Sequence, residues 1–324
     1  MRKPIVFMFS GQGSQYYQMG RELLLEDPAF RHWMLTLNEV YKELSGDSIL
    51  HQLYGNERKK SEAFDQLKLT HPAIFMVEFS LARILMERGV VPDYVLGSSL
   101  GEFTACAVAG VISYEDALAC IMKQAEIVGY SCREGGMLAI LQSKDLYEQE
   151  PVLYQKSELA AINASSHFVV SGLKDSLVEI ESYLKARESL YQRLSVRFAF
   201  HSSFIDPAEK AFTAFLKTLT VHRHPQINLV SCLTGGPIHE MKADFFWAVA
   251  REKINFPKAL DYLSQACGGG YTLMDLGPSG TLANFAKSDL ATARQADIIT
   301  LMSPYQNSFK QLRKSIDMVL AANV

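Results

Sequence analysis

The sequence predicts an α/β fold in which a large domain, residues 1–134 and 197–324, carries a small inserted α+β lobe, residues 135–196. Short apolar runs alternate with amphipathic helical patterns through the large domain, which is typical of a sheet with helices on both faces. In the lobe, strand-like runs instead follow one another closely. A Gly-x-Ser-x-Gly turn joins one strand of the large domain to a helix, and this turn gives the domain its candidate chemistry.

Composition predicts a globular protein without a nucleic-acid or membrane partner. The 324 residues are 48% hydrophobic and 21% charged, with a formal net charge of -3, so we expect no strongly basic surface. We expect no apolar run long enough to cross a bilayer, and no signal peptide. The five cysteines lack Cys-x-x-Cys spacing, which argues against a disulfide or zinc framework and favours a reducing cytoplasm. We expect a monomer without a bound metal or cofactor.

Five apolar runs are the predicted strands of the large sheet: Ile5–Phe9, Tyr94–Leu96, Ile227–Cys232, Thr272–Asp275 and Ile298–Met302. Helices are expected between them. Pro72 is expected in the first turn of a helix over Ala73–Arg88. Ser113 begins a capping box before a helix over Ala117–Val128. A last packing helix is expected over Ser308–Leu320.

The inserted lobe is predicted to contain four strands and one helix: Met137–Leu141, Leu159–Asn163, Phe168–Val170 and Tyr191–Val196 as strands, with the helix near Leu173–Ala186. After the last strand the chain returns to the large domain. We therefore expect a cleft between the two parts, where a substrate would bind.

Ser99 is the candidate nucleophile. Tyr94-Val-Leu-Gly-Ser-Ser-Leu-Gly-Glu102 combines an apolar strand, a turn flanked by glycines and the start of a small-residue helix. A sharp strand-to-helix turn projects the serine hydroxyl over a helix N-terminus, where backbone N–H groups are unpaired. The five-residue pattern alone also occurs in ordinary loops. The strand before it and the helix after it favour a nucleophile elbow.

A nucleophilic serine needs a base, and His201 is the best placed of the eight histidines. It lies in Phe198-Ala-Phe-His201, where the cleft is expected. A core histidine without a catalytic role is the alternative interpretation. No helical His-x-x-x-His pair with acidic neighbours points to metal catalysis.

Acyl chemistry also needs hydrogen-bond donors aimed at the developing oxyanion. Gln12 lies in the loop Ser10-Gly-Gln-Gly-Ser14, at the carboxyl end of the first strand, and the backbone N–H of Leu100 directly follows the nucleophile. The loop alone is equally compatible with an ordinary glycine-rich turn.

Together these motifs resemble the malonyl-CoA:acyl-carrier-protein transacylase family. The resemblance is closer to the free-standing acyltransferase homologues and acyl hydrolases of bacterial trans-acyltransferase polyketide clusters, of the bacillaene and pederin type. It covers nearly the whole chain through an ordered series of segments: Phe7-Met-Phe-Ser-Gly-Gln-Gly-Ser-Gln15, Thr70-His-Pro-Ala73, Gly97-Ser-Ser-Leu-Gly-Glu102, Gly110-Val-Ile112, Ala160-Ala-Ile-Asn163, Val169-Val-Ser-Gly172, Phe198-Ala-Phe-His201 and Leu276-Gly-Pro-Ser-Gly280.

The resemblance implies an α/β-hydrolase-like large domain with a ferredoxin-like small subdomain. It implies Ser99 as nucleophile and His201 as base, with Gln12 and the Leu100 amide as oxyanion donors. In this family a main-chain carbonyl, rather than an acid, typically orients the histidine. We expect that carbonyl between residues 251 and 257, with Asn255 as the candidate.

The chain departs from the family pattern at two positions. Ser98 replaces a histidine before the nucleophile, and this change either retunes the pocket or has no consequence. Gln124 stands where malonyl-selective relatives carry an arginine that pairs with the substrate's free carboxylate. It lies on an inward helix stripe, so it either lines the pocket or is a buried amide bonded to backbone. A neutral amide lacks arginine's bidentate contact, so we expect weak malonyl selection. Phe200 and Asn163 are the other expected pocket residues.

The leading functional hypothesis is an acyl hydrolase that removes non-malonyl acyl groups from acyl-carrier-protein thioesters through a Ser99 acyl-enzyme, as proofreading in polyketide biosynthesis. The alternative is an acyltransferase that loads malonyl or another acyl group from coenzyme A onto the carrier protein. A catalytically silent docking subunit is less favoured because the site residues are present. A lipase or esterase is less favoured because no His-Gly-Gly-Gly-like motif occurs.

The expected partners are acyl carrier protein domains of a polyketide synthase, with the substrate held on phosphopantetheine or on coenzyme A. Arg193 and Arg197 lie near the expected cleft. They are either contacts for an acidic carrier protein or ordinary solvated residues of a strand edge.

Overall fold

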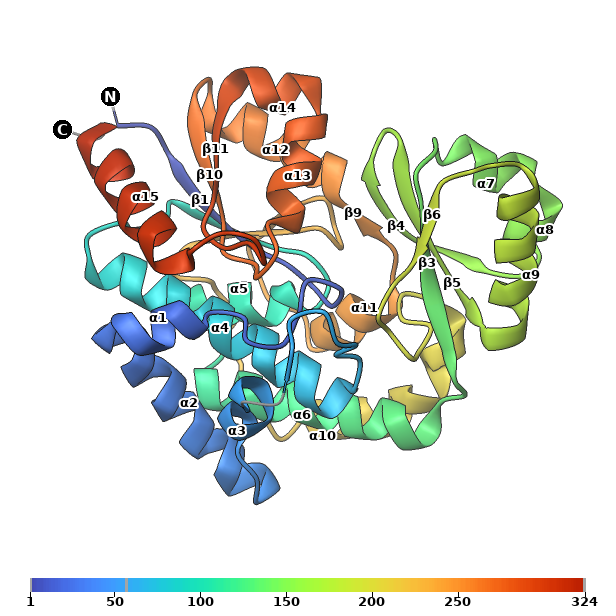
Figure 1. Ribbon diagram of the computed structural model, residues 1–324, viewed down its shortest axis with the longest axis horizontal. Coiled ribbons are helices and arrows are strands. Elements are labelled where there is room, and N and C mark those ends of the chain that lie inside the picture. Colours follow the sequence, from blue (N-terminus) through green and yellow to red (C-terminus); the bar gives the residue numbers. More distant parts are fainter. Residues whose placement is uncertain (1, 56–57, 323–324) are drawn as a thin grey trace.

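The computed structural model describes residues 2–55 and 58–322, which form a large body and a smaller lobe (Figure 1). The elements follow one another along the chain as β1 (Ile5–Phe9), α1 (Arg21–Glu26), α2 (Pro28–Ser45), α3 (Ile49–Tyr54), α4 (Leu67–Glu87), β2 (Tyr94–Gly97), α5 (Gly101–Val108), α6 (Tyr114–Ser131), β3 (Gly135–Ile140), α7 (Asp145–Gln149), α8 (Pro151–Tyr154), β4 (Glu158–Ala164), β5 (His167–Leu173), α9 (Lys174–Ala186), β6 (Tyr191–Arg193), a 3-10 turn (Ser203–Ala208), α10 (Glu209–Leu216), β7 (Asn228–Ser231), β8 (Gly236–Ile238), α11 (Phe245–Arg251), β9 (Ile254–Asn255), α12 (Phe256–Cys267), β10 (Tyr271–Asp275), α13 (Thr281–Ser288), α14 (Leu290–Gln295), β11 (Ala296–Thr300) and α15 (Ser308–Ala322).

The large sheet contains the five predicted strands and one strand that was not predicted. Its order is β11-β10-β1-β2-β7-β8, with the first five strands parallel and β8 antiparallel at one edge. All five residues of β1 are buried, as expected for a central strand covered on both faces. Strand β11 begins two residues earlier than the predicted start at Ile298. Helices α12, α13 and α14 gather around β10 and β11 (Figure 1).

The register of β1 and β2 brings two loops together at the carboxyl edge of this sheet. Phe9, the last residue of β1, pairs with Gly97, the last residue of β2. The Gly-Gln-Gly loop therefore starts directly beside the turn that holds Ser99. In open α/β sheets this edge is the usual place for a ligand.

Helix α4 differs from the prediction in its start. It begins at Leu67, so Pro72 lies inside the helix rather than in its first turn. A proline in a helix leaves the carbonyl four residues earlier without its N–H donor. That carbonyl belongs to Lys68, and the hydroxyl of Tyr41 lies 3.4 Å from it and donates to it instead. A contact from α2 thus compensates for the proline.

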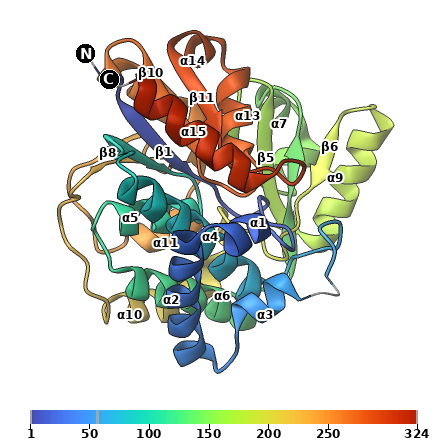
Figure 2. The same ribbon diagram turned by 60° about the vertical axis from the view of Figure 1, so that its left-hand side comes forward.

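Helix α4 also contradicts the expectation that no run could cross a membrane. In the described part of the chain it is the one helix long and apolar enough to do so, by length and composition. However, 83% of its most apolar window is buried inside the protein, in a position between α2, α5 and α6. This burial is usual for a core helix. Figure 2 shows α4 enclosed among its neighbours.

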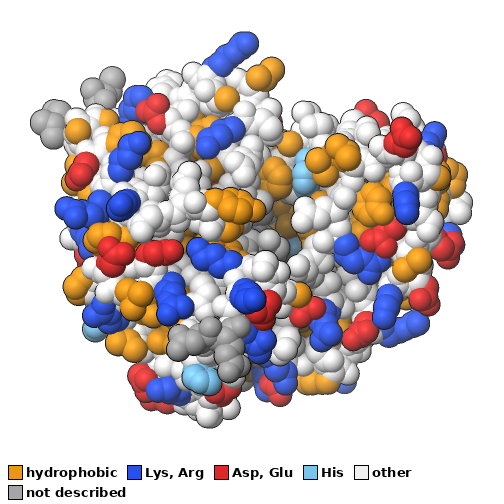
Figure 3. Space-filling view, in the orientation of Figure 1, with side chains coloured by type: hydrophobic (Ala, Val, Ile, Leu, Met, Phe, Trp, Pro, Cys, Tyr) orange, Lys and Arg blue, Asp and Glu red, His pale blue; other side chains and the backbone are white. Residues whose placement is uncertain are grey.

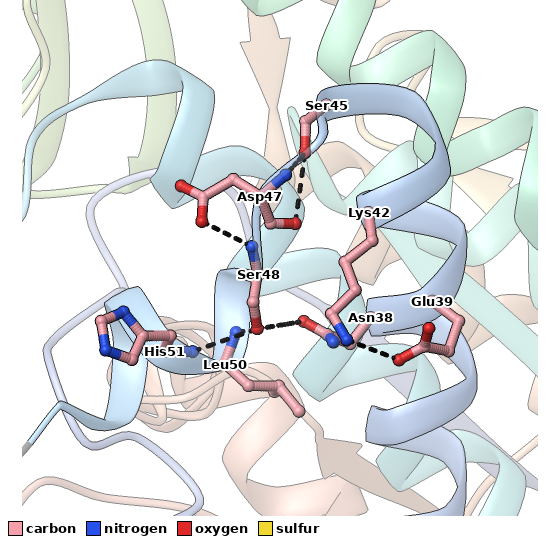
Figure 4. Close-up of polar contacts among 8 residues, drawn as sticks. All are labelled: Asn38, Glu39, Lys42, Ser45, Asp47, Ser48, Leu50 and His51. Carbon is pink, nitrogen blue, oxygen red and sulfur yellow. Dashed lines mark hydrogen bonds and ion pairs between the residues drawn. The ribbon is translucent and has the colours of Figure 1, made fainter.

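Polar caps define the ends of the surrounding helices. Ser113 accepts a hydrogen bond from the backbone N–H of Asp116 at 3.0 Å, which confirms the predicted cap of α6. At the corner between α2 and α3, Ser48 caps α3 and donates to Asn38 of α2 at 3.0 Å (Figure 4). Side-chain caps thus set the turn between these two helices.

The small lobe has the predicted ferredoxin-like arrangement. Its sheet has the order β6-β3-β5-β4-β9, in which the first four strands alternate with helices as β-α-β-β-α-β. Strand β9 comes from beyond the inserted segment and pairs in parallel with β4, through Ala161–Ile254 and Ile162–Asn255. A strand of the large domain's chain therefore completes the sheet of the lobe.

The two faces of the lobe's sheet pack against different cores, because side chains alternate along each strand. On β3, Leu138 and Ile140 face the lobe's own core, beneath α9. Met137 and Ala139 belong to the core of the large domain and line the main cavity. The lobe is thus a wall of the cavity as well as a folding unit.

Candidate active site

The turn after β2 has the geometry of a nucleophile elbow. Ser99 has a φ of 55°, in the left-handed region that side chains seldom adopt. Gly97 and Gly101 make this turn sterically feasible. A Cβ on Gly97 would lie 2.4 Å from the Cα of Glu102, and one on Gly101 would lie 2.1 Å from the carbonyl oxygen of Phe9. Larger residues at these positions would push the helix away from the sheet.

Ser99 and His201 lie together in the structure. The Oγ of Ser99 is 2.8 Å from the Nε2 of His201, although the two residues are separated by 102 positions in the chain. His201 is 4% exposed and has a φ of 60°, so both members of the pair occupy an uncommon backbone conformation. Strain of this kind concentrates at functional sites. The geometry matches that of a nucleophile and its base.

Main-chain carbonyls at the end of α11 hold His201. Its backbone N–H donates to Ala250 at 2.8 Å, and its Nδ1 lies 2.9 Å from the carbonyl oxygen of Glu252. Because a carbonyl only accepts, Nδ1 carries the proton and Nε2 is free to accept from Ser99. The prediction of Asn255 was therefore wrong, although the expected segment was right. Asn255 caps α12 instead, by accepting from the N–H of Lys258 at 3.2 Å.

Burial keeps His201 uncharged. Loss of solvation lowers its pKa to about 4, while the hydrogen bond to Glu252 raises it by less. A neutral imidazole is the form that can take a proton from serine. The ring is therefore in the state needed of a base across the neutral pH range.

The predicted oxyanion donors lie beside the elbow. In the described residues, the backbone N–H groups of Gln12 and Leu100 have no protein acceptor, so both are free to bind an oxyanion. The side chain of Gln12 is already engaged. Its Nε2 lies 3.3 Å from the hydroxyl of Thr70, and its Oε1 lies 2.9 Å from the Nε2 of His71. Main-chain amides are thus the available donors of this loop.

Two buried glutamates fasten the loops of the site to the body. Glu78 of α4 accepts from the N–H of Ser10 at 2.7 Å and from Thr104 of α5 at 3.1 Å. Glu102 of α5 accepts from Ser231 and from the N–H of Cys232, at 2.7 and 2.9 Å. Burial raises the pKa of each carboxyl to about 8. Burial therefore favours the protonated form of each carboxyl.

A cavity of about 330 Å³ opens over Ser99 and His201, between the large body and the lobe. The hollow between the two parts is visible in Figure 3. All the predicted pocket residues line it: Gln124, Ser98, Phe200 and Asn163. Gln124 is 3% exposed, and its Nε2 has no hydrogen-bond partner among the described residues. The interpretation of Gln124 as an amide bonded to backbone is thus not supported at this atom.

Sequence reasoning missed two histidines that line the cavity, His71 and His167. The predicted helix over Ala73–Arg88 did not include His71, whereas α4 begins at Leu67 and includes it. His167 lies in the hairpin of the lobe. Its Nδ1 lies 3.3 Å from the amide nitrogen of Asn163. Its ring packs on Phe285, with 4.8 Å between ring centres. The only sequence signal for His71 was its place in the Thr70-His-Pro-Ala73 segment.

The two arginines considered as carrier-protein contacts are both paired within the chain. Arg193 makes two hydrogen bonds of 2.9 Å to Glu181 on the outer side of the lobe. Arg197 lies 3.5 Å from Asp65 of the large body, with its side chain 55% exposed. This favours the interpretation of Arg193 as an ordinary strand-edge residue.

Comparison with known proteins identifies the family of this chain. The acyl transferase domain family matches residues 6–319. The chain is 44% identical over 321 residues to the polyketide biosynthesis acyltransferase homologue BaeD of Bacillus velezensis, covering 99% of this chain and 98% of BaeD. It is 45% identical over 314 residues to the homologue PksD of Bacillus subtilis, covering 96% and 95% of the two chains.

A solved structure has the same fold. The acyl transferase domain of SpnD, determined in complex with 2-(pent-4-yn-1-yl)malonyl, aligns with a TM-score of 0.89 and 26% identity. The alignment covers 100% of this chain and 77% of that one. The family match over residues 6–319 and the two relatives matched over nearly their full length show the family of this chain. The chain therefore belongs to the acyl transferase domain family and is similar over its whole length to the free-standing polyketide acyltransferase homologues.

Proposed function

We propose that this protein is an acyl hydrolase of polyketide biosynthesis, which removes non-malonyl acyl groups from acyl-carrier-protein thioesters. Ser99 Oγ attacks the thioester carbonyl and passes its proton to His201, which protonates the departing pantetheine thiol. The N–H groups of Gln12 and Leu100 stabilise the negative oxygen that forms. Water then attacks the Ser99 ester, gives a proton to His201, and the free acid leaves as Ser99 regains its proton.

The observation that carries this proposal is the neutral lining of the cavity. No lysine or arginine is among the described residues that line it, and Gln124 contributes only an amide. A malonyl carboxylate buried there would lack a countercharge, which is costly once the carboxylate has lost its water. Uncharged acyl groups do not have this desolvation cost. The pocket therefore favours them over malonyl.

The polyketide setting rests on similarity. BaeD and PksD are named as polyketide biosynthesis acyltransferase homologues. The substrate we propose is an acyl group on the phosphopantetheine arm of a carrier protein, which reaches Ser99 through the open cavity. Release of wrongly attached acyl groups would return the carrier to its free thiol form.

A time course followed by intact-protein mass spectrometry tests the proposal. The enzyme is incubated with acetyl-, butyryl- and malonyl-loaded carrier protein, and with the matching coenzyme A esters plus unloaded carrier. We expect acetyl and butyryl to be lost from the carrier while malonyl is spared. Ser99→Ala is the control and should leave every thioester intact. Survival of all thioesters with the active enzyme would refute the hydrolase.

The names of the relatives favour a second candidate, an acyltransferase that loads malonyl or another acyl group from coenzyme A onto the carrier. It uses the same acyl-enzyme and differs only in the acceptor, which is a carrier thiol rather than water. Net gain of malonyl on the carrier in the same experiment would support this candidate.

A further inference from the structure

Helix α4 contacts the loop after β1 at two points. Glu78 accepts from the backbone N–H of Ser10 at 2.7 Å, and the same carboxyl oxygen lies 2.9 Å from the Ser10 hydroxyl. Nε2 of His71 lies 2.9 Å from Oε1 of Gln12. Glu78 is 0% exposed and His71 is 2% exposed. Seven positions separate them, which is about two helical turns, so both contacts come from one face of α4.

These contacts hold Gln12 by its side chain and leave its main chain free. An amide oxygen only accepts, so Nε2 of His71 donates to Gln12. On the other side of the amide, Nε2 of Gln12 lies 3.3 Å from the hydroxyl of Thr70, the neighbour of His71 on α4. The backbone N–H of Gln12 has no acceptor among the described residues. The donor proposed for the oxyanion thus belongs to a residue whose side-chain amide is held at both of its polar atoms.

The loop that α4 holds lies directly against the nucleophile. Gly11 stands between Ser10 and Gln12, and a Cβ on it would lie 2.7 Å from the Cβ of Ser99. Ser14 closes the loop on itself by donating to the carbonyl of Gly11 at 2.9 Å. Because the loop packs this closely on the elbow, the positions of Ser10 and Gln12 set the distance from the Gln12 N–H to the atoms that react at Ser99.

We propose that Glu78 and His71 are positioning residues that fix the backbone N–H of Gln12 where the oxyanion forms. The inference rests on the proposed function, because it concerns the acyl-enzyme step at Ser99, which the hydrolase and the acyltransferase share. Glu78 is not among the residues that line the cavity, so it acts through Ser10 rather than on the substrate. A donor already in place stabilises the developing charge without reorganisation, whereas a loosely held loop has to be ordered during the reaction.

A single-turnover experiment separates positioning from folding. Enzyme in excess is mixed with butyryl-loaded carrier protein, and intact-protein mass spectrometry follows the loss of butyryl from the carrier. The limiting rate constant at saturating enzyme reports the reaction of each folded active site, whereas a misfolded fraction only raises the enzyme concentration needed for half-saturation. We expect Glu78→Leu and His71→Leu to lower the limiting rate constant about tenfold to hundredfold, because a displacement of about 1 Å can cost this much.

Conservative variants at the same two positions should restore the reaction. Glu78→Gln keeps an oxygen that accepts from the N–H of Ser10, and His71→Gln keeps an N–H donor for the side chain of Gln12. We expect the limiting rate constant of each to return most of the way to that of the parent. The comparison of leucine with glutamine therefore assigns the effect to the hydrogen bonds.

Asn38→Leu is the matched control. Asn38 is 2% exposed, lies at the corner of α2 and α3, and is not part of the cavity lining (Figure 4). Its side-chain oxygen accepts from the Ser48 hydroxyl at 3.0 Å and from the N–H of Leu50 at 3.2 Å. It therefore resembles Glu78 in bonding one hydroxyl and one backbone N–H. We expect this variant to unfold at a lower urea concentration but to keep the parental limiting rate constant.

The outcomes distinguish this inference from the proposed function. If the parent deacylates the carrier in a Ser99-dependent manner and both leucine variants keep its limiting rate constant, the acyl-enzyme stands and the positioning role is wrong. A rise in the half-saturating concentration alone, or an equal loss of rate in Asn38→Leu, would reduce the contacts of Glu78 and His71 to a structural role. If the parent leaves the butyryl carrier intact, the proposed function fails and the inference fails with it.

Discussion

The carbonyl oxygen of Glu252 lies 2.9 Å from Nδ1 of His201 and takes the place that a carboxylate occupies in a serine-histidine-acid triad. A carbonyl fixes the tautomer and the ring orientation but supplies no negative charge. In the proposed mechanism, the imidazolium that forms during proton transfer is therefore stabilised less strongly than in such a triad. The oxyanion donors beside Ser99 gain importance as a result.

Asn255→Ala should affect stability more than catalysis. Asn255 caps α12, and loss of such a cap typically costs about 0.5–2 kcal/mol of unfolding free energy. The carbonyl of Glu252 remains in place, so we expect kcat to stay within about threefold of the parent. Urea unfolding and thioester turnover measure the two effects. A large loss of kcat with unchanged stability would restore Asn255 as the residue that orients His201.

The pH profile of kcat/KM should show its acid limb well below the usual range for histidine. Burial lowers the pKa of His201 to about 4, compared with an ordinary value of 6.5. The base must be unprotonated, so activity falls only as pH drops through the lowered pKa. Hydrolysis of a small thioester between pH 4 and pH 8 measures the limb. A midpoint at about 6.5 would contradict the structure.

Gln124→Arg should increase the reaction with malonyl relative to butyryl. The guanidinium supplies a bidentate partner for a carboxylate in a cavity that has none among its described lining residues. We expect the malonyl-to-butyryl ratio of kcat/KM to rise by about tenfold or more. Competition between the two carrier thioesters, read by mass spectrometry, gives this ratio directly. Gln124→Lys supplies a positive charge without the planar guanidinium, so it separates the effect of bidentate geometry from the effect of charge. An unchanged ratio for Gln124→Arg would mean that the residue does not meet the acyl chain.

Glu102→Gln should flatten the pH dependence of stability. Burial raises the folded-state pKa of Glu102 to about 8, above its ordinary value of 4.5. The folded protein thus holds a proton that the unfolded chain releases, and unfolding free energy falls as pH rises from about 4.5 to 8. Glutamine removes this contribution and retains an acceptor for Ser231. Denaturation at pH 6 and pH 8.5 should show a smaller difference in the variant than in the parent. The contribution of Glu78 to the pH dependence of the unfolding free energy should remain.

The sequence predicted the features that depend on local residue types. The elbow followed from glycines spaced around Ser99, and the cap of α6 followed from Ser113 with Asp116 three residues later. The lobe followed from the altered spacing of apolar runs. These patterns act within a few residues, so they are visible without a structure.

The missed features depend on distant or main-chain partners. The early start of α4 places Pro72 inside the helix, where the hydroxyl of Tyr41 donates to the carbonyl that the proline leaves free, and no local pattern encodes that contact. The anchor of His201 is a carbonyl, which every residue type supplies. The segment could therefore be predicted, but the residue could not. His71 lines the cavity from the part of α4 that extends back beyond Pro72.

Strand β9 limits how freely the two parts of this protein can be exchanged. Two residues of β9 complete the sheet of the lobe, and they begin two positions after the carbonyl that holds His201. Deleting the lobe would remove the pairing partner of this strand. Grafting a lobe from a relative would alter the setting of the histidine together with the wall of the cavity. We therefore expect the shape of the cavity and the orientation of His201 to change together in chimaeras built from this chain.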